Sequence, residues 1–185
     1  PYDSPEQLLE KIAEHARSHP YQNPLLGSGF LAPAFGVAGP TAAQLDAIVP
    51  DRPALIIDEG GHTGWANTLA LEAAGISRDT PDPVPGAHFF QRDEEGNPTG
   101  WLVEGAAIDP VTEALGVISE EALALAAPDF FKDMSAVGLT SAFDAGMIDT
   151  GELGRRLALK LVEAGEFPVR MVASLYVNQP GQLPT

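Results

Sequence analysis

Hydrophobic residues in the first part of the chain recur every three to four positions in some segments and form short continuous runs in others. This pattern predicts helices that alternate with short strands. The stretch SPEQ at 4–7 is a capping box with proline at the first helical position, so we expect a helix through about Arg17. The run LLGSGF predicts a strand over 25–30. A second capping box at 41–44 opens a short helix, and the apolar run ALII predicts a strand over 54–58.

The middle of the chain interrupts this alternation. A helix is predicted from about Trp65 to Ala74, where a glycine ends it. The following segment SRDTPDPVPGA is rich in proline and extended, and two apolar runs on either side of EGNP predict a β-hairpin.

Regular alternation returns in the last third of the chain. The predicted elements are a helix capped by a serine, a strand, a second helix and a second strand, over 119–137, 139–144, 151–164 and 169–177. The last three form a β-α-β unit, so we expect two parallel strands with a right-handed crossover.

These elements together predict the α/β class. We expect part of a (β/α) barrel, or an open α/β sheet, with an inserted cap that contains the hairpin. The predicted organisation is one structural unit, with barrel portions at 1–75 and 119–185 and the inserted lid at 76–118. The chain has too few β-α steps to close an eight-stranded barrel by itself.

Composition and charge narrow the classes of partner. The formal net charge is −16 and only 10 of the 185 residues are lysine or arginine, so a nucleic-acid partner is disfavoured. Cysteine is absent, which excludes disulfides, thiolate metal sites and a cysteine nucleophile. The sequence shows no long apolar run and no signal peptide, so we expect no membrane partner and a cytoplasmic location. Because the chain starts at Pro1 and not at a methionine, we expect it to be a piece of a longer protein.

Polar side chains cluster where the strand over 54–58 ends. Asp58 lies at the carboxyl end of this strand, the end at which barrels keep their sites, and His62 and Asn67 flank the start of the next helix. One interpretation is a substrate site. The other is that Asp58 and Thr63 only cap the helix while the glycines between them make the turn.

Two further places carry chemically active side chains. Asp144 ends a later strand, in GLTSAFDAG, and is either a substrate contact or a turn-forming side chain. His15 and His19 are one helical turn apart, a spacing at which two imidazoles can share a metal. They also stand at a helix C-terminus, where a histidine commonly faces the helix dipole and water, and this is our interpretation. The chain has 4 histidines and no His-x-His pair, so we expect no metal site within it.

The stretch PDRPALIIDEGGHTGWANTLALEAAGISRDTPDP resembles the signature segment of the amidohydrolase-3 family, metal-dependent hydrolases that include N-substituted formamide deformylases. The stretches TAAQLDAIVPDRP, RDEEGNPTGWLVEGA and GLTSAFDAG are similar to the same family in order and spacing. Together they cover most of residues 22–147. One departure is that Glu59 and an additional glycine precede His62, where the family usually has Asp-Gly-His.

The resemblance implies a distorted eight-stranded (β/α) barrel, a β-sandwich built from both termini, and a large insertion that covers the active site. It also implies one or two divalent metals, usually zinc, that activate water for attack on an amide-type C–N bond. The family's metal ligands are a His-x-His pair, a mid-barrel lysine or acidic residue, two later histidines and a late aspartate. None of these motifs is visible here, so the chain is similar to a fragment that contains the lid and lacks the metal centre.

By the same resemblance, His62, Trp65 and Asn67 occupy positions near the family's substrate pocket, with Asp58 and Asp144 as further candidate substrate contacts. His62 would hydrogen-bond a carbonyl or carboxylate and Trp65 would wall the pocket, whereas Asn67 could equally bond the turn backbone. We expect no catalytic residue in this chain, a small amide or formamide as the substrate, and leave homo-oligomerisation open. The rival hypothesis is a non-catalytic binding or regulatory module that reuses the fold.

Overall fold

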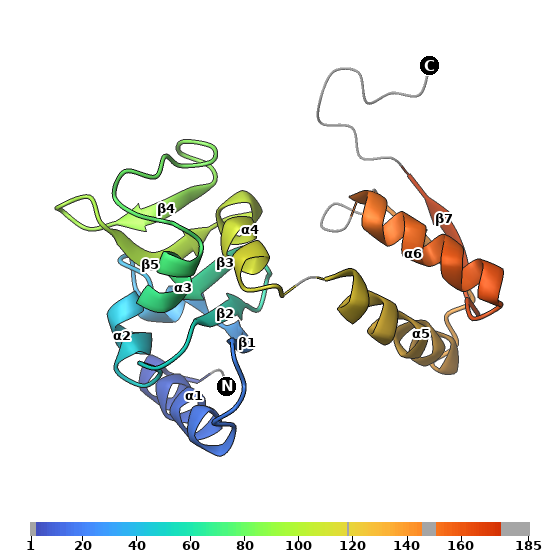
Figure 1. Ribbon diagram of the computed structural model, residues 1–185, viewed down its shortest axis with the longest axis horizontal. Coiled ribbons are helices and arrows are strands. Elements are labelled where there is room, and N and C mark those ends of the chain that lie inside the picture. The colour runs from blue at the N-terminus through green and yellow to red at the C-terminus, as the bar shows by residue number, and fades with distance from the viewer. Residues whose placement is uncertain (1–2, 118, 146–150, 175–185) are drawn as a thin grey trace. The chain divides into compact units, whose positions relative to one another are not determined.

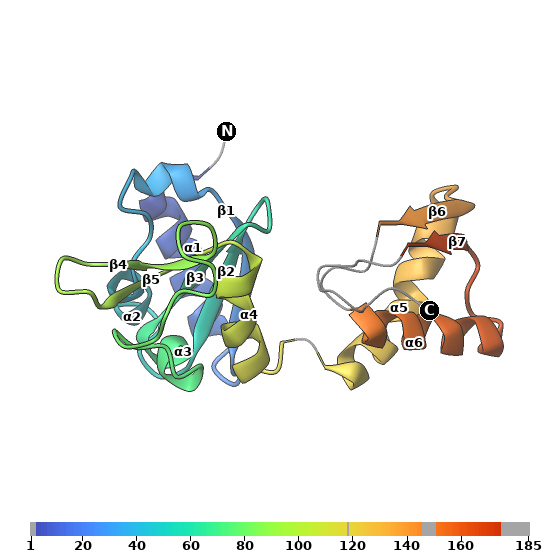
Figure 2. The same ribbon diagram turned by 90° about the horizontal axis from the view of Figure 1, so that it is seen from above.

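The computed structural model describes residues 3–117, 119–145 and 151–174, and the chain divides into two compact units between Val117 and Ile118. Figures 1 and 2 show the elements of each unit, which are described separately. In the described part of the chain, no helix is long and apolar enough to cross a membrane.

The first unit is a five-stranded sheet with helices on both faces. Its elements are α1 (Pro5–Ser18), β1 (Leu25–Phe30), the 3-10 helix η1 (Ala32–Phe35), α2 (Ala42–Asp46), β2 (Ala54–Asp58), β3 (Thr63–Ala66), α3 (Thr68–Ala73), β4 (Phe89–Arg92), β5 (Pro98–Val103) and α4 (Gly105–Ala114). The strand order is β1-β2-β3-β5-β4. Only β1 and β2 run parallel in this sheet, and each of its other neighbouring pairs is antiparallel.

Two apolar clusters lie on opposite faces of this sheet. Successive side chains of a strand point to opposite faces, so Ile56 of β2 joins one cluster and its neighbour Leu55 joins the other. The Ile56 cluster packs under α1, which contributes Ile12 and Ala16. The Leu55 cluster includes buried side chains of α3 and α4, so the sheet is covered on both sides.

Local sequence signals predicted several of these elements correctly. Helix α1 begins with the reciprocal capping box, in which the Ser4 hydroxyl accepts from the Gln7 amide and the Gln7 side chain accepts from the Ser4 amide. Helix α2 begins with the same arrangement at Thr41 and Gln44. The predicted hairpin is also present, as the antiparallel pair β4 and β5. Strand β5 is hydrogen-bonded to β3 as well, so the hairpin extends the sheet formed by the preceding residues.

The helix predicted from Trp65 is wrong in its first residues. Trp65 lies in strand β3, opposite Ile56 of β2 and Trp101 of β5, and the helix begins only at Thr68. Cross-strand pairing on both sides keeps 63–66 extended, so β2 and β3 form an antiparallel hairpin in place of the expected strand-turn-helix.

Helix α4 was not predicted at all. Pro110 lies inside it and Gly105 begins it, and both residue types disfavour a helix interior. Its buried Val111 and Ile108 pack on the sheet, and this tertiary burial overrides the unfavourable local sequence.

The second unit contains α5 (Glu120–Ala136), β6 (Ser141–Asp144), α6 (Gly151–Ala164) and β7 (Arg170–Ala173). Strands β6 and β7 pair in parallel, which confirms the predicted parallel β-α-β pairing. Of the strand predicted over 169–177, residues 175–177 lie outside the described residues. The described chain is therefore a mixed α/β structure, as the predicted class requires.

Candidate functional site

The turn between β2 and β3 is organised by the carboxylate of Asp58. Its Oδ1 accepts hydrogen bonds from the backbone amides of His62, at 2.8 Å, and Thr63, at 2.9 Å. Gly61 has φ 72°, in the left-handed region that favours glycine, and donates from its amide to the Asp58 carbonyl at 3.2 Å. Asp58 therefore shapes the turn, and the predicted helix cap by Asp58 and Thr63 is wrong, because Asn67 caps α3 and Thr63 lies in β3.

His62 stands at the end of this turn and is joined to Glu104 by two hydrogen bonds. The ring Nδ1 of His62 lies 2.9 Å from Oε2 of Glu104. The backbone amide of Glu104 also donates to the His62 carbonyl at 2.7 Å. The His62 side chain is 71% exposed and is therefore accessible to a ligand, whereas Trp65 and Asn67 are buried.

The neighbouring carboxylates change the titration of His62. The hydrogen bond and the charge of Glu104, with a smaller contribution from Asp58, raise the pKa of the His62 ring above its usual 6.5. With Nδ1–H directed at a carboxylate, the other ring nitrogen, Nε2, is the second donor of this exposed ring when it is protonated. The protonated ring can then donate from Nε2 to an acceptor oxygen.

Glu104 itself adopts a backbone conformation that is rare for a residue with a side chain. Its φ is 68° and its ψ is 160°, and it is the one non-glycine residue with positive φ in the described ranges. This region is populated almost only by glycine, and holding another residue there costs on the order of 1–3 kcal/mol. The strain lies at the junction of β5 and α4, where Glu104 meets His62.

Sequence reasoning missed Glu104. It lies 42 residues from His62, and only the pairing of β3 with β5 brings the two together. The signal that could have found it is its place in RDEEGNPTGWLVEGA, where a lone carboxylate follows the last strand residue and precedes a glycine.

Trp65 and Asn67 are fully buried, with 0% exposure each. The indole Nε1 of Trp65 donates to the Thr41 carbonyl at 2.7 Å, and the ring packs edge-on against Phe30 and Phe35. Asn67 caps α3 and its side chain bonds only backbone groups. For Asn67 the alternative in which it bonds the turn backbone is the arrangement found. Trp65 was predicted to wall a pocket, but its side chain has no exposed surface in this structure and packs in the core beneath α1 instead.

Asp144 ends β6 in the second unit. Its backbone carbonyl accepts from the amide of Ser174 at 3.0 Å. Asp144 and His62 belong to different compact units of the chain. Its substrate contact stays a prediction.

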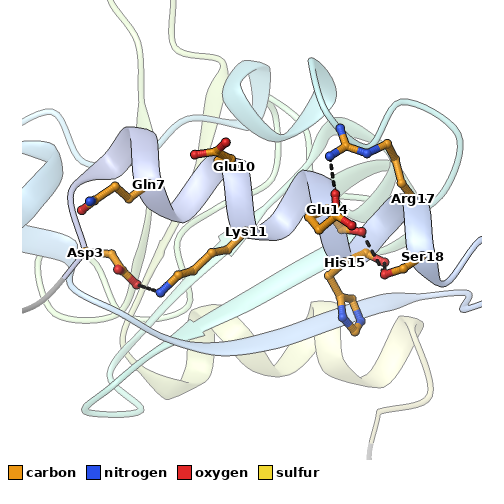
Figure 3. Close-up of a pocket in the computed structure, with 8 residues that line it drawn as sticks. All are labelled: Asp3, Gln7, Glu10, Lys11, Glu14, His15, Arg17 and Ser18. Carbon is orange, nitrogen blue, oxygen red and sulfur yellow. Dashed lines mark hydrogen bonds and ion pairs between the residues drawn. The ribbon is translucent and has the colours of Figure 1, made fainter.

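Of the two histidines at the end of α1, His15 lines a surface pocket along this helix (Figure 3). Figure 3 shows charged side chains along this helix pairing with one another, Lys11 with Asp3 at 2.6 Å and Arg17 with Glu14. The His15 and His19 rings stack at 4.1 Å, and Nδ1 of His19 bonds the His15 carbonyl at 3.0 Å. Nε2 of His15 lies 2.8 Å from the side-chain oxygen of Gln22, so both rings bond groups at the end of the helix.

The acidic and imidazole groups at the β2–β3 turn do not fit a metal centre. Oδ1 of Asp58 already accepts two amides, and Nδ1 of His62 is held by Glu104. Within 3–117, 119–145 and 151–174, no group of three or more His, Asp or Glu side chains is arranged to hold a metal ion. The expectation that metal ligands lie elsewhere stays a prediction.

Comparison with known proteins places these observations in a family. The model of the amidohydrolase family, Amidohydro_3, matches residues 1–184, and the chain belongs to this family. It is 36% identical over 166 residues, 88% of the chain, to the exoenzymes regulatory protein AepA of Pectobacterium carotovorum subsp. carotovorum. It is 38% identical over 103 residues, 55% of the chain, to the N-substituted formamide deformylase of Arthrobacter pascens.

Solved structures agree on the fold. An uncharacterized metal-dependent hydrolase from Pyrococcus horikoshii OT3 matches 93% of the chain with a TM-score of 0.58 at 19% identity. A similar hydrolase from Pyrococcus furiosus matches 90% with a TM-score of 0.56 at 18% identity. The chain spans 31% and 32% of these two structures, and 35% and 19% of the two curated relatives.

Proposed function

We propose that the whole protein is a metal-dependent hydrolase that cleaves a non-peptide C–N bond in a small amide or N-substituted formamide. The observation that carries this proposal is the family match over residues 1–184, together with an exposed His62 held on a carboxylate. Similarity to a relative named N-substituted formamide deformylase supports the formamide as the substrate class.

In this proposal the chain supplies groups on the substrate side of the reaction. A divalent metal, zinc in our proposal, would supply an activated water and would be held by residues outside this chain. His62 would donate from Nε2 to a carbonyl or carboxylate oxygen of the substrate. The Asp58 carboxylate stabilises the turn that contains His62. The buried side chains of Trp65 and Asn67 hold β3 and the start of α3 in place.

The architecture of the whole protein is part of the same proposal. The chain would form part of a (β/α) barrel, and residues 76–118 would cover the active site as a lid. The pairing of β5 with β3 then ties the lid to the sheet, so motion would be confined to the loop before β4. We also propose a cytoplasmic location, in line with the absence of cysteine.

A second function is favoured by one specific observation. The relative that matches 88% of the chain is named a regulatory protein of exoenzymes. A non-catalytic binding or regulatory module built on the amidohydrolase fold would explain that name, and the exposed His62 would then contact a bound effector.

Enzymatic assay of the whole protein separates the two functions. Amine and formate release from N-substituted formamides, and amine and acetate release from the matching acetamides, would be measured with bound metal and after chelation. Turnover that is lost on chelation and restored by zinc supports the hydrolase. A metal-loaded protein that releases no amine from either series supports the regulatory module. The 185-residue chain alone is expected to bind no stoichiometric zinc and to show no turnover.

A further inference from the structure

The conformation of Glu104 is hard to explain by stability. Glycine adopts positive φ without steric cost, and the next residue, Gly105, shows that glycine is used at this junction. The chain nevertheless has a glutamate at the strained position. We propose that Glu104 is a positioning residue, which holds the His62 ring so that Nε2 is presented to an acceptor oxygen of the ligand. The identity of that ligand rests on the proposed function.

Glu104 and His62 are joined by two hydrogen bonds, and only one of them needs the Glu104 side chain. The bond from the Glu104 amide to the His62 carbonyl, at 2.7 Å, uses only backbone atoms and would form with any residue except proline at this position. The carboxylate contributes only the bond to Nδ1, at 2.9 Å. Both side chains are well exposed, at 71% and 40%, and exposed ion pairs add little to stability. The carboxylate therefore orients the ring and does not hold the fold together.

The chemistry of the dyad selects the ligand group. Two carboxylates, Glu104 and Asp58, act on the His62 ring and favour its charged form. A charged ring with Nδ1–H on Glu104 has one free donor, Nε2–H, and no free acceptor. Such a group matches a carbonyl or carboxylate oxygen and rejects a cation. Among small amides, this favours substrates that carry an oxygen acceptor near the cleaved bond and no positive charge there.

The experiment uses the 185-residue chain with three substitutions. Glu104→Gly removes both the strain and the carboxylate, Glu104→Gln keeps an acceptor without charge, and Glu113→Gln is a control on the exposed side of α4. Urea unfolding midpoints give stability. Ring 15N shifts of His62 against pH give its tautomer and its pKa.

For Glu104→Gly we expect the urea midpoint and the His62 pKa to change in opposite directions. Glu104→Gly should raise the urea midpoint while the His62 pKa falls toward 6.5 and the preference for the Nδ1–H tautomer disappears. Glu104→Gln should keep the tautomer and lower the pKa, and Glu113→Gln should change neither quantity. A purely structural glutamate would lose stability on replacement by glycine.

The proposal is overturned if Glu104→Gly is less stable than the original chain, or if its His62 ring titrates as before with the same tautomer. These readouts need neither substrate nor metal, so they can succeed or fail independently of the proposed hydrolase activity.

Discussion

The side-chain oxygen of Asn67 accepts hydrogen bonds from the amides of Ala54 and Ala70, each at 2.9 Å, and so joins the start of β2 to the first turn of α3. Its amide nitrogen donates to the carbonyls of Val49 and Arg52 at 3.0 and 2.9 Å. Replacement by alanine would remove the helix cap and leave several buried backbone groups without partners. We expect Asn67→Ala to lower the free energy of unfolding by roughly 3 kcal/mol or more, measured by urea unfolding.

An exposed asparagine gives the control for this substitution. Asn97 lies in the β4–β5 turn and bonds only to Asp93. Asn97→Ala should cost about 1 kcal/mol or less. If Asn67→Ala cost no more than Asn97→Ala, the role of Asn67 as the buried link between β2 and α3 would be wrong.

Gly100 of β5 lies where backbone from two other elements leaves no room for a side chain. It has φ 100°, and a Cβ there would lie 2.5 Å from the Ala66 carbonyl oxygen and 2.6 Å from the Ala42 nitrogen. Both are backbone atoms that can move only with the sheet or α2, so we expect Gly100→Ala to destabilise the chain by about 3 kcal/mol or more. The control is Gly86→Ala, which has φ 78° and no atom within 4 Å, and should cost about 1–2 kcal/mol. Equal urea midpoints for the two variants would contradict this packing.

Arg92 holds the proline-rich loop against the hairpin. Its guanidinium donates to the carbonyls of Ser77 and Arg78 at 3.3 Å each, and to Gly96 at 3.0 Å. We expect Arg92→Ala to speed hydrogen exchange of the loop amides about tenfold or more, because bonds from a charged donor to several carbonyls are lost. The exchange to be measured is that of the Val84 and His88 amides, each of which donates to the other residue's carbonyl.

The same exchange experiment tests the proposed motion of the lid. Amides of β5, paired on both sides, should exchange slowly in the original chain and in Arg92→Ala. Arg17→Ala, which breaks an exposed pair on α1, should leave the loop unchanged. Fast exchange in β5 of the original chain would contradict a lid that is anchored to the sheet.

The ion pair of His62 makes stability depend on pH in a defined direction. Glu104, by its hydrogen bond and charge, raises the folded-state pKa of His62 above the ordinary 6.5. The stabilisation is therefore complete below pH 6.5 and is lost as pH rises through the folded-state pKa. The urea midpoint of the original chain should exceed that of His62→Gln at about pH 5.5, and the difference should shrink toward about pH 8. A difference that grew with pH would contradict the assigned partner.

Elements were predictable from the sequence where the residues that define them lie within a few positions of one another. The capping boxes at Ser4 and Thr41 place their partners three residues away, so the helix starts could be read directly. Strand β3 could not, because its four residues are held by β2 on one side and by β5, more than thirty residues later, on the other. Helix α4 was hidden by Pro110, whose local penalty is outweighed by tertiary burial.

The candidate site shows the same division between local and distant interactions. For Asp58 the sequence allowed a substrate contact or a helix cap, and the turn that its carboxylate forms with amides within five residues was neither of these. His62 was identified from its place after a strand and from the family resemblance. Glu104 was missed because its contact with His62 exists only after the sheet has formed.

In the proposed function His62, oriented by Glu104, contacts the substrate of a metal-dependent amidohydrolase. The most direct test is kcat/KM of the metal-loaded whole protein on an N-substituted formamide, compared between the original protein, His62→Gln and His19→Gln. Losing one donated hydrogen bond to the reacting substrate should lower kcat/KM about tenfold or more in His62→Gln. His19→Gln, at the exposed end of α1, should match the original. An active enzyme whose kcat/KM is the same with and without His62 would contradict a contact between His62 and the substrate.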